Sequence, residues 1–354
     1  MCYMGNSMVL VGLSGGVDSA VAAFLLKKAG YEVVGLHLIL WKYRYGPNNL
    51  IKNEEILKMI TQIIGIDYKT IDVTDEFWNR IVKYFIAELS RGVTPNPCVI
   101  CNPTLKLTTF LEQADNYKFE LISTGHYARI IHSGNVFGIS RAKDSKKDQS
   151  YMLNQLTQKH LKRLILPLGE LNKSYTREVA REIGLPIEMM RESQDLCFLS
   201  GHDYRKFIKE YAPEILQPGD IVNLQGEVVG EHQGLAFYTI GQRKGIGING
   251  DTPLYVIRKD IKLNRLIVSS ENYLGSDQLI AGPVNWISGE APPLPSEMQV
   301  KIRSTAKMIY GTIYPMDKKF VKVKFKDQLR DITPGQFAVF YQEDSLLGGG
   351  VIKD

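Results

Sequence analysis

The sequence predicts an α/β fold in which a parallel-sheet domain is followed by a small central domain and a C-terminal β-barrel. Three observations support this prediction. An apolar run, Met8–Val11, leads through a glycine-rich turn into a helix-like segment. Apolar strands alternate with amphipathic helices over roughly the first two hundred residues, and short alternating strands follow from Met298. We therefore expect domains at residues 1–200, 201–285 and 286–354.

The N-terminal elements alternate in the order typical of a parallel sheet. Strands are expected at Val9–Gly12, Val33–Leu40 and Ile122–Gly125, and helices at Ser19–Ala29, Glu54–Ile64, Asp75–Ser90 and Leu105–Asn116. Such a sheet is covered by helices on both faces and binds ligands at the carboxyl ends of its strands. The glycine-rich turn and Thr124–His126 would then line one crevice.

The pattern changes past about residue 200, where helical periodicity fades and glycine-flanked apolar fragments take over. Barrel strands are expected at Val300–Arg303, Met308–Tyr314, Phe320–Phe325 and Gln336–Tyr341. The proline-rich stretch 291–295 is the best candidate for a linker.

Composition narrows the class of protein. No apolar run in the 354 residues approaches the roughly 18 needed to span a bilayer, so we expect no membrane partner. The first residues lack a basic segment and a cleavable apolar stretch, and four cysteines do not make a disulfide framework. These features favour a cytoplasmic protein. The formal charge of +5 gathers in two basic segments, 141–181 and 301–354, which suit a polyanion such as nucleic acid.

Residues Gly12–Ser19 read Gly-Leu-Ser-Gly-Gly-Val-Asp-Ser between the first strand and helix. Backbone N–H groups and the helix dipole favour an anion here, and the two glycines let a phosphate come close. No Gly-Lys-Ser/Thr follows, so this is not a Walker loop. It resembles the loop of pyrophosphatase-type (PP-loop) enzymes, which split ATP into AMP and pyrophosphate. The resemblance implies phosphate contacts from Ser14 and Ser19 and Mg²⁺ binding by Asp18. The expected ATP-binding residues are Gly12, Leu13, Ser14, Gly15, Gly16, Val17, Asp18, Ser19, Leu38 and Gly125.

The cysteines form a second candidate site. Cys98 and Cys101 lie in segment 94–103, whose three prolines predict a stiffened loop with no regular helix. Cys197 lies far along the chain, and Cys2 is incidental. A lone Cys-x-x-Cys has four interpretations: half a zinc site, a redox pair, two iron–sulfur ligands, or two small buried side chains. Structural zinc is disfavoured because no second pair of Cys or His ligands is present.

An ordered set of further motifs makes a family resemblance specific. The set comprises Asn96-Pro97-x-x-x-Cys101-Asn102, Thr124–Arg129, Lys147–Tyr151, Cys197-Phe198, Tyr238–Gly245, Pro334–Gln336 and Leu347–Gly350. Together with the ATP loop they resemble the tRNA-specific 2-thiouridylases of the MnmA family, which replace O2 of the wobble uridine with sulfur. The resemblance runs nearly end to end. It implies a PP-loop ATP-binding catalytic domain, a central domain and a C-terminal β-barrel.

The resemblance also implies roles for particular residues. ATP would adenylate O2 of the uridine, and sulfur would then displace AMP. Cys197 would carry a persulfide received from a cysteine desulfurase or a sulfur relay protein, and Cys101 would complete the transfer. The implied tRNA contacts are Asn96, Pro97, Cys98, His126, Lys147, Asp148, Gln149, Arg303 and Gln336.

Cys98 departs from the family pattern, because many members carry Asp at this position. A thiol hydrogen-bonds weakly and has an ordinary pKa near 8.5, so the base role assigned to that Asp is not carried over. With Cys98, Cys101 and Cys197 the chain has three thiolates that could hold a [4Fe–4S] cluster, with one iron open to bind sulfide. The alternative is that Cys98 is a tolerated substitution beside a persulfide mechanism. We weigh the cluster slightly above the persulfide, because Cys98 supplies the third thiolate that an Asp-bearing relative lacks.

A rival function is a small-molecule adenylating ligase or amidotransferase that uses the same ATP loop. It gives no reason for reactive cysteines in distant segments or for a basic barrel. We therefore expect an ATP-dependent tRNA-uridine 2-sulfurtransferase.

Overall fold

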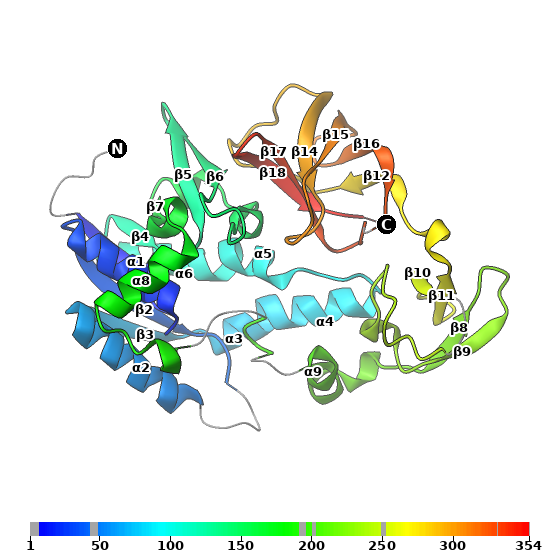
Figure 1. The fold of residues 1–354 in the computed structure, drawn as a ribbon, viewed down its shortest axis with the longest axis horizontal. Helices are drawn as coiled ribbons and strands as arrows, with labels where there is room; N and C mark the ends of the chain where they lie inside the picture. The colour runs from blue at the N-terminus through cyan, green and yellow to red at the C-terminus, as the bar shows by residue number, and fades with distance from the viewer. Residues whose placement is uncertain are drawn as a thin grey trace.

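The computed structural model describes residues 7–42, 49–190, 196–199, 203–248, 253–330 and 332–353. Its three sheets have five, four and nine strands. In Figure 1 the five-stranded sheet lies at the left with its helices, the nine-stranded sheet lies at the top and the four-stranded sheet lies at the lower right. The predicted succession of an α/β domain, a small central domain and a barrel is confirmed.

The five-stranded sheet is parallel throughout and has the order β3-β2-β1-β4-β7. Its strands are β1 (Met8–Gly12), β2 (Glu32–Ile39), β3 (Asp67–Asp72), β4 (Leu121–Ser123) and β7 (Leu164–Ile165). Val9 pairs with Val33 on one side and with Leu121 on the other, so the winding of the chain reverses between β1 and β4. Ligands bind at this kind of switch point in open α/β sheets.

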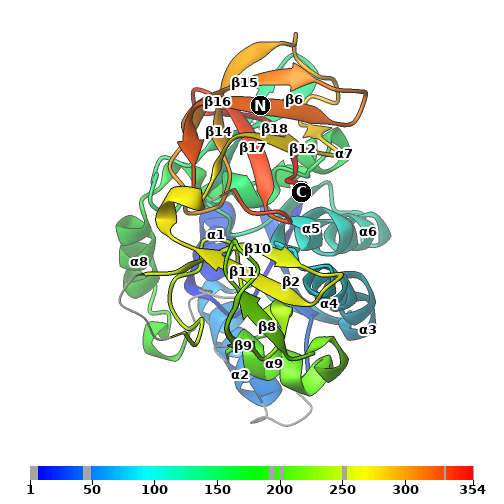
Figure 2. The same cartoon turned by 90° about the vertical axis from the view of Figure 1, so that its right-hand side faces the viewer.

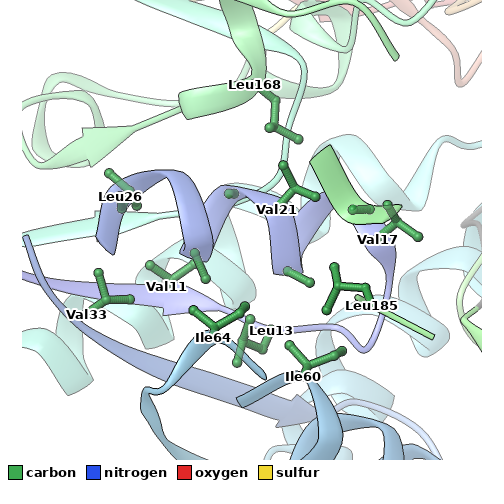
Figure 3. Packing of buried hydrophobic residues seen from close by; sticks show 14 of the residues in the cluster. Val11, Leu13, Val17, Val21, Leu26, Val33, Ile60, Ile64, Leu168 and Leu185 are labelled. Atoms are coloured by element: carbon green, nitrogen blue, oxygen red, sulfur yellow. The ribbon is translucent and has the colours of Figure 1, made fainter. Parts of the chain in front are cut away.

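Helices cover both faces of this sheet because the residues of β1 alternate between two apolar clusters. Val9 and Val11 pack with α1 (Val17–Lys28), α2 (Asn49–Ile64) and α8 (Lys173–Glu182). Figure 3 shows Val11 and Val33 of the sheet packed beside Val21 of α1 and Ile64 of α2. Leu10 packs on the opposite face with α6 (Leu107–Asn116). A strand buried on both faces explains why β1 reads as a continuous apolar run.

The cysteine-bearing segment is helical, so the prediction of a stiffened loop is wrong. It runs through α5 (Pro97–Cys101) and a π-helical turn, η2 (Asn102–Lys106), directly into α6. Pro97 occupies the first turn of α5, where a missing N–H costs nothing. Pro103 falls in the first turn of the π-helical segment, whose wider hydrogen-bond spacing accommodates it.

Short helical elements complete the N-terminal region. They are α3 (Thr74–Phe77), η1 (Trp78–Val82), α4 (Lys83–Ser90), η3 (Ser150–Leu153), α7 (Gln158–Leu161), η4 (Pro167–Glu170) and η5 (Ile187–Met189). The predicted helix at Asp75–Ser90 is therefore present as the run α3, η1 and α4, with a π-helical turn in its middle.

The central region contains α9 (Tyr204–Tyr211) and a four-stranded sheet of order β10-β11-β8-β9. Its strands are β8 (Gly219–Val222), β9 (Val228–His232), β10 (Tyr255–Asp260) and β11 (Arg265–Ser269), and its short helices are η6 (Pro213–Ile215), η7 (Leu235–Phe237) and η8 (Glu271–Tyr273). Its apolar core is shared with α4 and the cysteine-bearing helix, because Phe85, Cys101 and Val256 belong to one cluster. This packing fixes the central region against the N-terminal domain.

The nine-stranded sheet combines C-terminal strands with a hairpin from the N-terminal domain. Its members are β5 (Ala128–Ser133), β6 (Val136–Arg141), β12 (Ser276–Ala281), β13 (Asn285–Trp286), β14 (Ser296–Lys301), β15 (Ile309–Pro315), β16 (Val321–Leu329), β17 (Phe337–Gln342) and β18 (Ser345–Val351). The sheet takes in β12, ahead of the boundary predicted at 285/286. A bridge between Ala281 and Ile352 brings the ends of β12 and β18 together. Figure 2 shows this sheet stacked above the other two regions.

Candidate functional site

The segment Gly12–Ser19, here called the phosphate loop, leaves the carboxyl end of β1 and enters α1. Gly15 has a φ of +80°, which favours glycine. Within the loop the Ser14 N–H donates to Ser19 Oγ at 3.2 Å, and Ser19 Oγ donates to the Gly16 carbonyl at 2.9 Å. The N-cap residue of α1 is Gly16, which has no side chain to cap the helix. The helix N-terminus is therefore open toward an anion, as the sequence predicts.

The carboxylate of Asp18 is held by residues from two other elements. Tyr127 donates its hydroxyl to Asp18 Oδ1 at 2.9 Å, and the Lys173 ammonium at the start of α8 lies 2.6 Å from the same oxygen. The Tyr127 oxygen also lies 3.0 Å from the Thr176 hydroxyl. Lys173 thus brings to the phosphate loop a positive charge that the loop's own sequence lacks. Sequence reasoning missed this residue, since a lysine early in an amphipathic helix carries no local signal.

Gly125 joins the end of β4 to the phosphate loop. A Cβ at this position would lie 2.8 Å from the Asp18 carbonyl carbon and the Ser19 nitrogen, closer than side-chain carbons approach backbone. This contact agrees with the prediction that Thr124–His126 and the phosphate loop line one crevice. Leu38 lies near the carboxyl end of β2, at the same edge of the sheet. At the floor of the loop, His37 Nδ1 donates to the Leu13 carbonyl at 2.7 Å.

Cys98 and Cys101 lie one helical turn apart on α5. The Asn96 side chain caps this helix by accepting from the Val99 N–H at 3.4 Å. Cys101 is buried, with 3% of its surface exposed, whereas Cys98 is half-buried. Burial raises the pKa of Cys101 to about 12 and raises that of Cys98 as well. Both groups are therefore neutral thiols at neutral pH in the absence of substrate.

Lys106, at the end of η2, is the cation that acts on all three thiols. Its positive charge opposes the rise in the pKa values of Cys98, Cys101 and Cys197. Burial lowers the pKa of Lys106, but its attraction to the three cysteine sulfurs in their ionised form outweighs this effect and raises the pKa overall. Lys106 is thus a cation placed to stabilise negative sulfur. Sequence reasoning missed it, because its only signal is a position five residues after Cys101.

Cys197 is held near this cation by its neighbour Phe198. The side chain of Cys197 is exposed, yet the surrounding protein desolvates the thiol and raises its pKa. Phe198 is 1% exposed. Its ring centroid lies 5.3 Å from Phe85 of α4 and 5.0 Å from Phe207 of α9. Phe198 therefore anchors the Cys197 segment between the N-terminal and central regions.

His126 links the phosphate loop to the thiols. It follows Gly125, and its Nδ1 lies 2.8 Å from the Thr124 hydroxyl. Burial, followed by the charge of Lys106, lowers the pKa of His126 to about 4, so the imidazole is neutral at pH 7. The same lysine acts on the three thiols. The nucleotide end of the crevice and the sulfur end are therefore neighbours.

The three thiols do not form a ready metal site. Within the part of the chain that the structure describes, no three His, Cys, Asp or Glu side chains are grouped so that they could hold a metal ion. Cys98, Cys101 and Cys197 are thus not grouped around a site for a single metal ion.

The predicted tRNA contacts Lys147, Asp148 and Gln149 differ in accessibility. Lys147 is exposed. The Asp148 side chain is 1% exposed and accepts from the Ala142 N–H and the Ser150 hydroxyl. Gln149 accepts from the Tyr127 N–H at 2.9 Å. The hydrogen bonds of Asp148 and Gln149 therefore fix the conformation of the loop on which Lys147 is exposed.

Arg303 and Gln336 lie where the barrel meets the cysteine-bearing segment. Gln336 Nε2 donates to the Thr94 carbonyl at 2.8 Å, and the Arg303 guanidinium donates to the Thr333 hydroxyl. Thr94 precedes Asn96 and Pro97, which begin α5. These four predicted contacts therefore gather around one junction between the barrel and the catalytic domain.

Comparisons with known proteins agree with this architecture. Three family models match, described as a tRNA methyl transferase HUP domain at residues 7–201, a tRNA methyl transferase PRC-barrel domain at 205–270 and an aminomethyltransferase beta-barrel domain at 276–352. The tRNA-specific 2-thiouridylase MnmA of Clostridium acetobutylicum is 38% identical over 98% of this chain and 100% of its own length. The chain belongs to the MnmA family. The MnmA protein of Natranaerobius thermophilus is 40% identical over 99% of this chain and 98% of its own.

One similar solved structure is the U34-tRNA thiolase NcsA from Methanococcus maripaludis with its [4Fe-4S] cluster. It is 19% identical, with a TM-score of 0.36, over 60% of this chain and 67% of that one. Among the residues that the structure describes, no helix is both long and apolar enough to cross a membrane.

Proposed function

We propose that the protein replaces O2 of the wobble uridine of tRNA with sulfur, using ATP to activate the oxygen. Membership of the MnmA family supports tRNA as the substrate. The observation that carries the proposal is the adjacency of the two ends of the crevice. Gly125 packs on the phosphate loop. The charge of Lys106 lowers the pKa of the following residue, His126, and Lys106 also interacts electrostatically with the three thiols.

The first step activates the uridine. O2 attacks the α-phosphorus of ATP, pyrophosphate leaves, and AMP becomes bonded to O2, which turns a poor leaving group into a good one. The open N-terminus of α1 and the charge of Lys173 stabilise the phosphates. Asp18 Oδ1 is engaged by Tyr127 and Lys173, so its second oxygen would hold Mg²⁺, which would neutralise the leaving pyrophosphate.

The second step supplies sulfur from Cys197 as a persulfide. Its terminal sulfur attacks C2, AMP leaves with the oxygen, and a disulfide joins Cys197 to C2 of the base. The Cys101 thiolate then attacks Cys197 Sγ, which releases 2-thiouridine and leaves a Cys101–Cys197 disulfide for a cellular thiol to reduce. Alternatively, Cys101 attacks the persulfide first and free sulfide attacks C2. Lys106 stabilises the anionic sulfur in both routes.

We favour the persulfide over a [4Fe–4S] cluster because the persulfide route needs only Cys101 and Cys197, and the charge of Lys106 acts on both of these thiols. Two partners follow from this choice. One is the anticodon region of tRNA, and the other is a cysteine desulfurase or sulfur relay protein that loads Cys197. We propose the cytoplasm as the site of the reaction, since tRNA and ATP are both present there.

The experiment is nucleoside mass spectrometry of tRNA from cells with and without the protein, followed by reconstitution with ATP and a desulfurase. The proposal expects 2-thiouridine to disappear without the protein and to be restored by the purified enzyme with one AMP per sulfur. Unchanged 2-thiouridine in cells that lack the protein would instead favour a small-molecule adenylating ligase of the same ATP-loop class.

A further inference from the structure

The outer face of β15 and β16 carries lysines beside tyrosines. On β16 the residues Val321, Val323 and Phe325 are buried in the barrel core. The alternate residues must therefore point outward, since side chains alternate along a strand. We name this surface the lysine–tyrosine face, and it consists of Tyr310, Thr312, Tyr314, Lys322, Lys324 and Lys326.

The strand register places the two rows side by side. Lys322 pairs with Tyr314 and Lys324 with Thr312, and Tyr310 precedes Gly311, which pairs with Phe325. Tyr310 and Tyr314 are 60% and 40% exposed. Successive lysines of the row are about 7 Å apart along the strand, on the scale of the separation between neighbouring phosphates of one nucleic-acid strand.

The charge of this face is not neutralised by the protein. Among the described residues, none forms an ion pair with Lys322, Lys324 or Lys326. Three acidic residues flank the face: Asp327 follows Lys326 on β16, Asp277 precedes Gln278, the β12 partner of Lys324, and Glu297 of β14 pairs with Thr312. Asp317, in the turn before β16, accepts from the backbone N–H groups of Lys319 and Phe320. The face therefore carries a net positive charge.

The face extends away from the predicted tRNA junction. β15 begins at Ile309, which pairs with Val300 near the end of β14, and Arg303 follows that end. Tyr310 and Lys326 thus lie at the Arg303 end, whereas Tyr314 and Lys322 lie at the far end. Figure 2 shows β15 and β16 running across the top of the molecule, above the catalytic domain.

We infer that the lysine–tyrosine face binds the phosphate backbone of the tRNA stem next to the anticodon loop. This inference rests on the proposed function for the identity of its ligand. A nucleotide held in the crevice leaves its flanking stem outside, and the face continues outward from the Arg303 end of the barrel. Lysine ammonium groups and tyrosine hydroxyls donate to phosphate oxygens without reading sequence. Such contacts fix the register of the stem and make binding depend on salt.

The test uses the full-length protein with Lys322, Lys324 and Lys326 all changed to Gln. The matched control changes Lys28, Lys58 and Lys118 to Gln; these lysines are exposed and lie on α1, on α2 and just after α6. Both variants lose three positive charges. The measurements are the affinity for unmodified tRNA at several salt concentrations, the affinity for an anticodon stem–loop and the affinity for an unpaired RNA of equal length.

The face variant should bind tRNA and the stem–loop at least about tenfold more weakly at physiological salt, and its salt slope should be smaller by roughly two to three. The control should keep the wild-type slope. At saturating tRNA the face variant should keep its kcat, and its KM for tRNA should rise. Circular dichroism and ATP binding check the fold, and Lys324→Gln alone serves if the triple variant does not fold.

Two results would overturn the inference. One is equal affinity and salt slope for the face variant and the wild type. The other is a loss confined to unpaired RNA, which would assign the face to a single strand. These binding measurements do not depend on turnover. A wild-type protein that binds the stem–loop through this face yet makes no 2-thiouridine would contradict the proposed function alone.

Discussion

The phosphate loop and the thiol site are built in opposite ways. The phosphate loop is a single run, Gly12–Ser19, whose geometry follows from hydrogen bonds within the run. The thiols come from two segments far apart in the chain and meet around Lys106. The loop is open toward anions, whereas burial keeps the thiols neutral. The phosphate loop therefore has its binding geometry before the nucleotide binds, whereas the thiols must be ionised before they can react.

This difference predicts two separable chemical steps. Changes in the phosphate loop should remove adenylation and, with it, thiolation. Changes among the thiols should remove sulfur transfer while AMP formation continues. Four substitutions test this separation, from the largest expected effect to the smallest.

Asp18→Asn should have the largest effect. The carboxylate positions the Lys173 ammonium and, in the proposed reaction, its second oxygen would hold Mg²⁺, so the amide would weaken both contributions to phosphate stabilisation. We expect AMP formation and thiolation to fall together by roughly 10²–10³-fold. Parallel assays of AMP and 2-thiouridine measure this, and a loss of only one product would contradict the assignment.

Gly125→Ala should weaken ATP binding by roughly 10- to 100-fold, because its Cβ would lie 2.8 Å from the backbone of Asp18 and Ser19. ATP affinity can be measured by calorimetry on the full-length protein. Gly134→Ala is the matched control, since a Cβ there meets nothing within 4 Å. Its φ of +57° carries local strain without any contact to the loop. Equal ATP affinity in both variants would show that Gly125, which follows β4, is not part of the nucleotide site.

Lys106→Met should slow sulfur transfer about tenfold near neutral pH and leave AMP formation intact. The lysine charge lowers the thiol pKa values against the effect of burial, so its removal raises them further and reduces the thiolate fraction. Thiolation rates between pH 7 and 9 should rise with pH in both proteins, with the variant displaced to higher pH. Lys106→Arg should restore the wild-type profile. Superimposable profiles for the Lys106→Met variant and the wild-type enzyme would contradict this role.

Cys98→Ser should have the smallest effect, within about threefold of wild type, because the persulfide route uses only Cys101 and Cys197. The measurement is turnover from a desulfurase by protein shown to be iron-free. A cluster mechanism predicts the opposite, namely loss of both iron and activity in Cys98→Ser.

The sequence was informative where structure is local. The parallel sheet, the phosphate loop and the barrel strands follow from periodicity and from one short motif, and the structure bears them out. The helix carrying Cys98 was missed, because prolines at a helix N1 position and in a π-helical turn read as breakers. Lys173 and Lys106 were missed because their partners lie in other segments or are buried thiols. Neither a contact with a distant segment nor proximity to a buried thiol produces a recognisable pattern in the local sequence.

The separation of the two steps is tested most directly by Cys197→Ser in a reconstituted reaction with tRNA, ATP and a desulfurase. AMP and 2-thiouridine are counted in the same samples. The account predicts AMP formation within a fewfold of wild type on the first turnover and no 2-thiouridine. Loss of AMP formation would show that the two ends of the crevice act as one unit, and continued thiolation would remove Cys197 from the sulfur route.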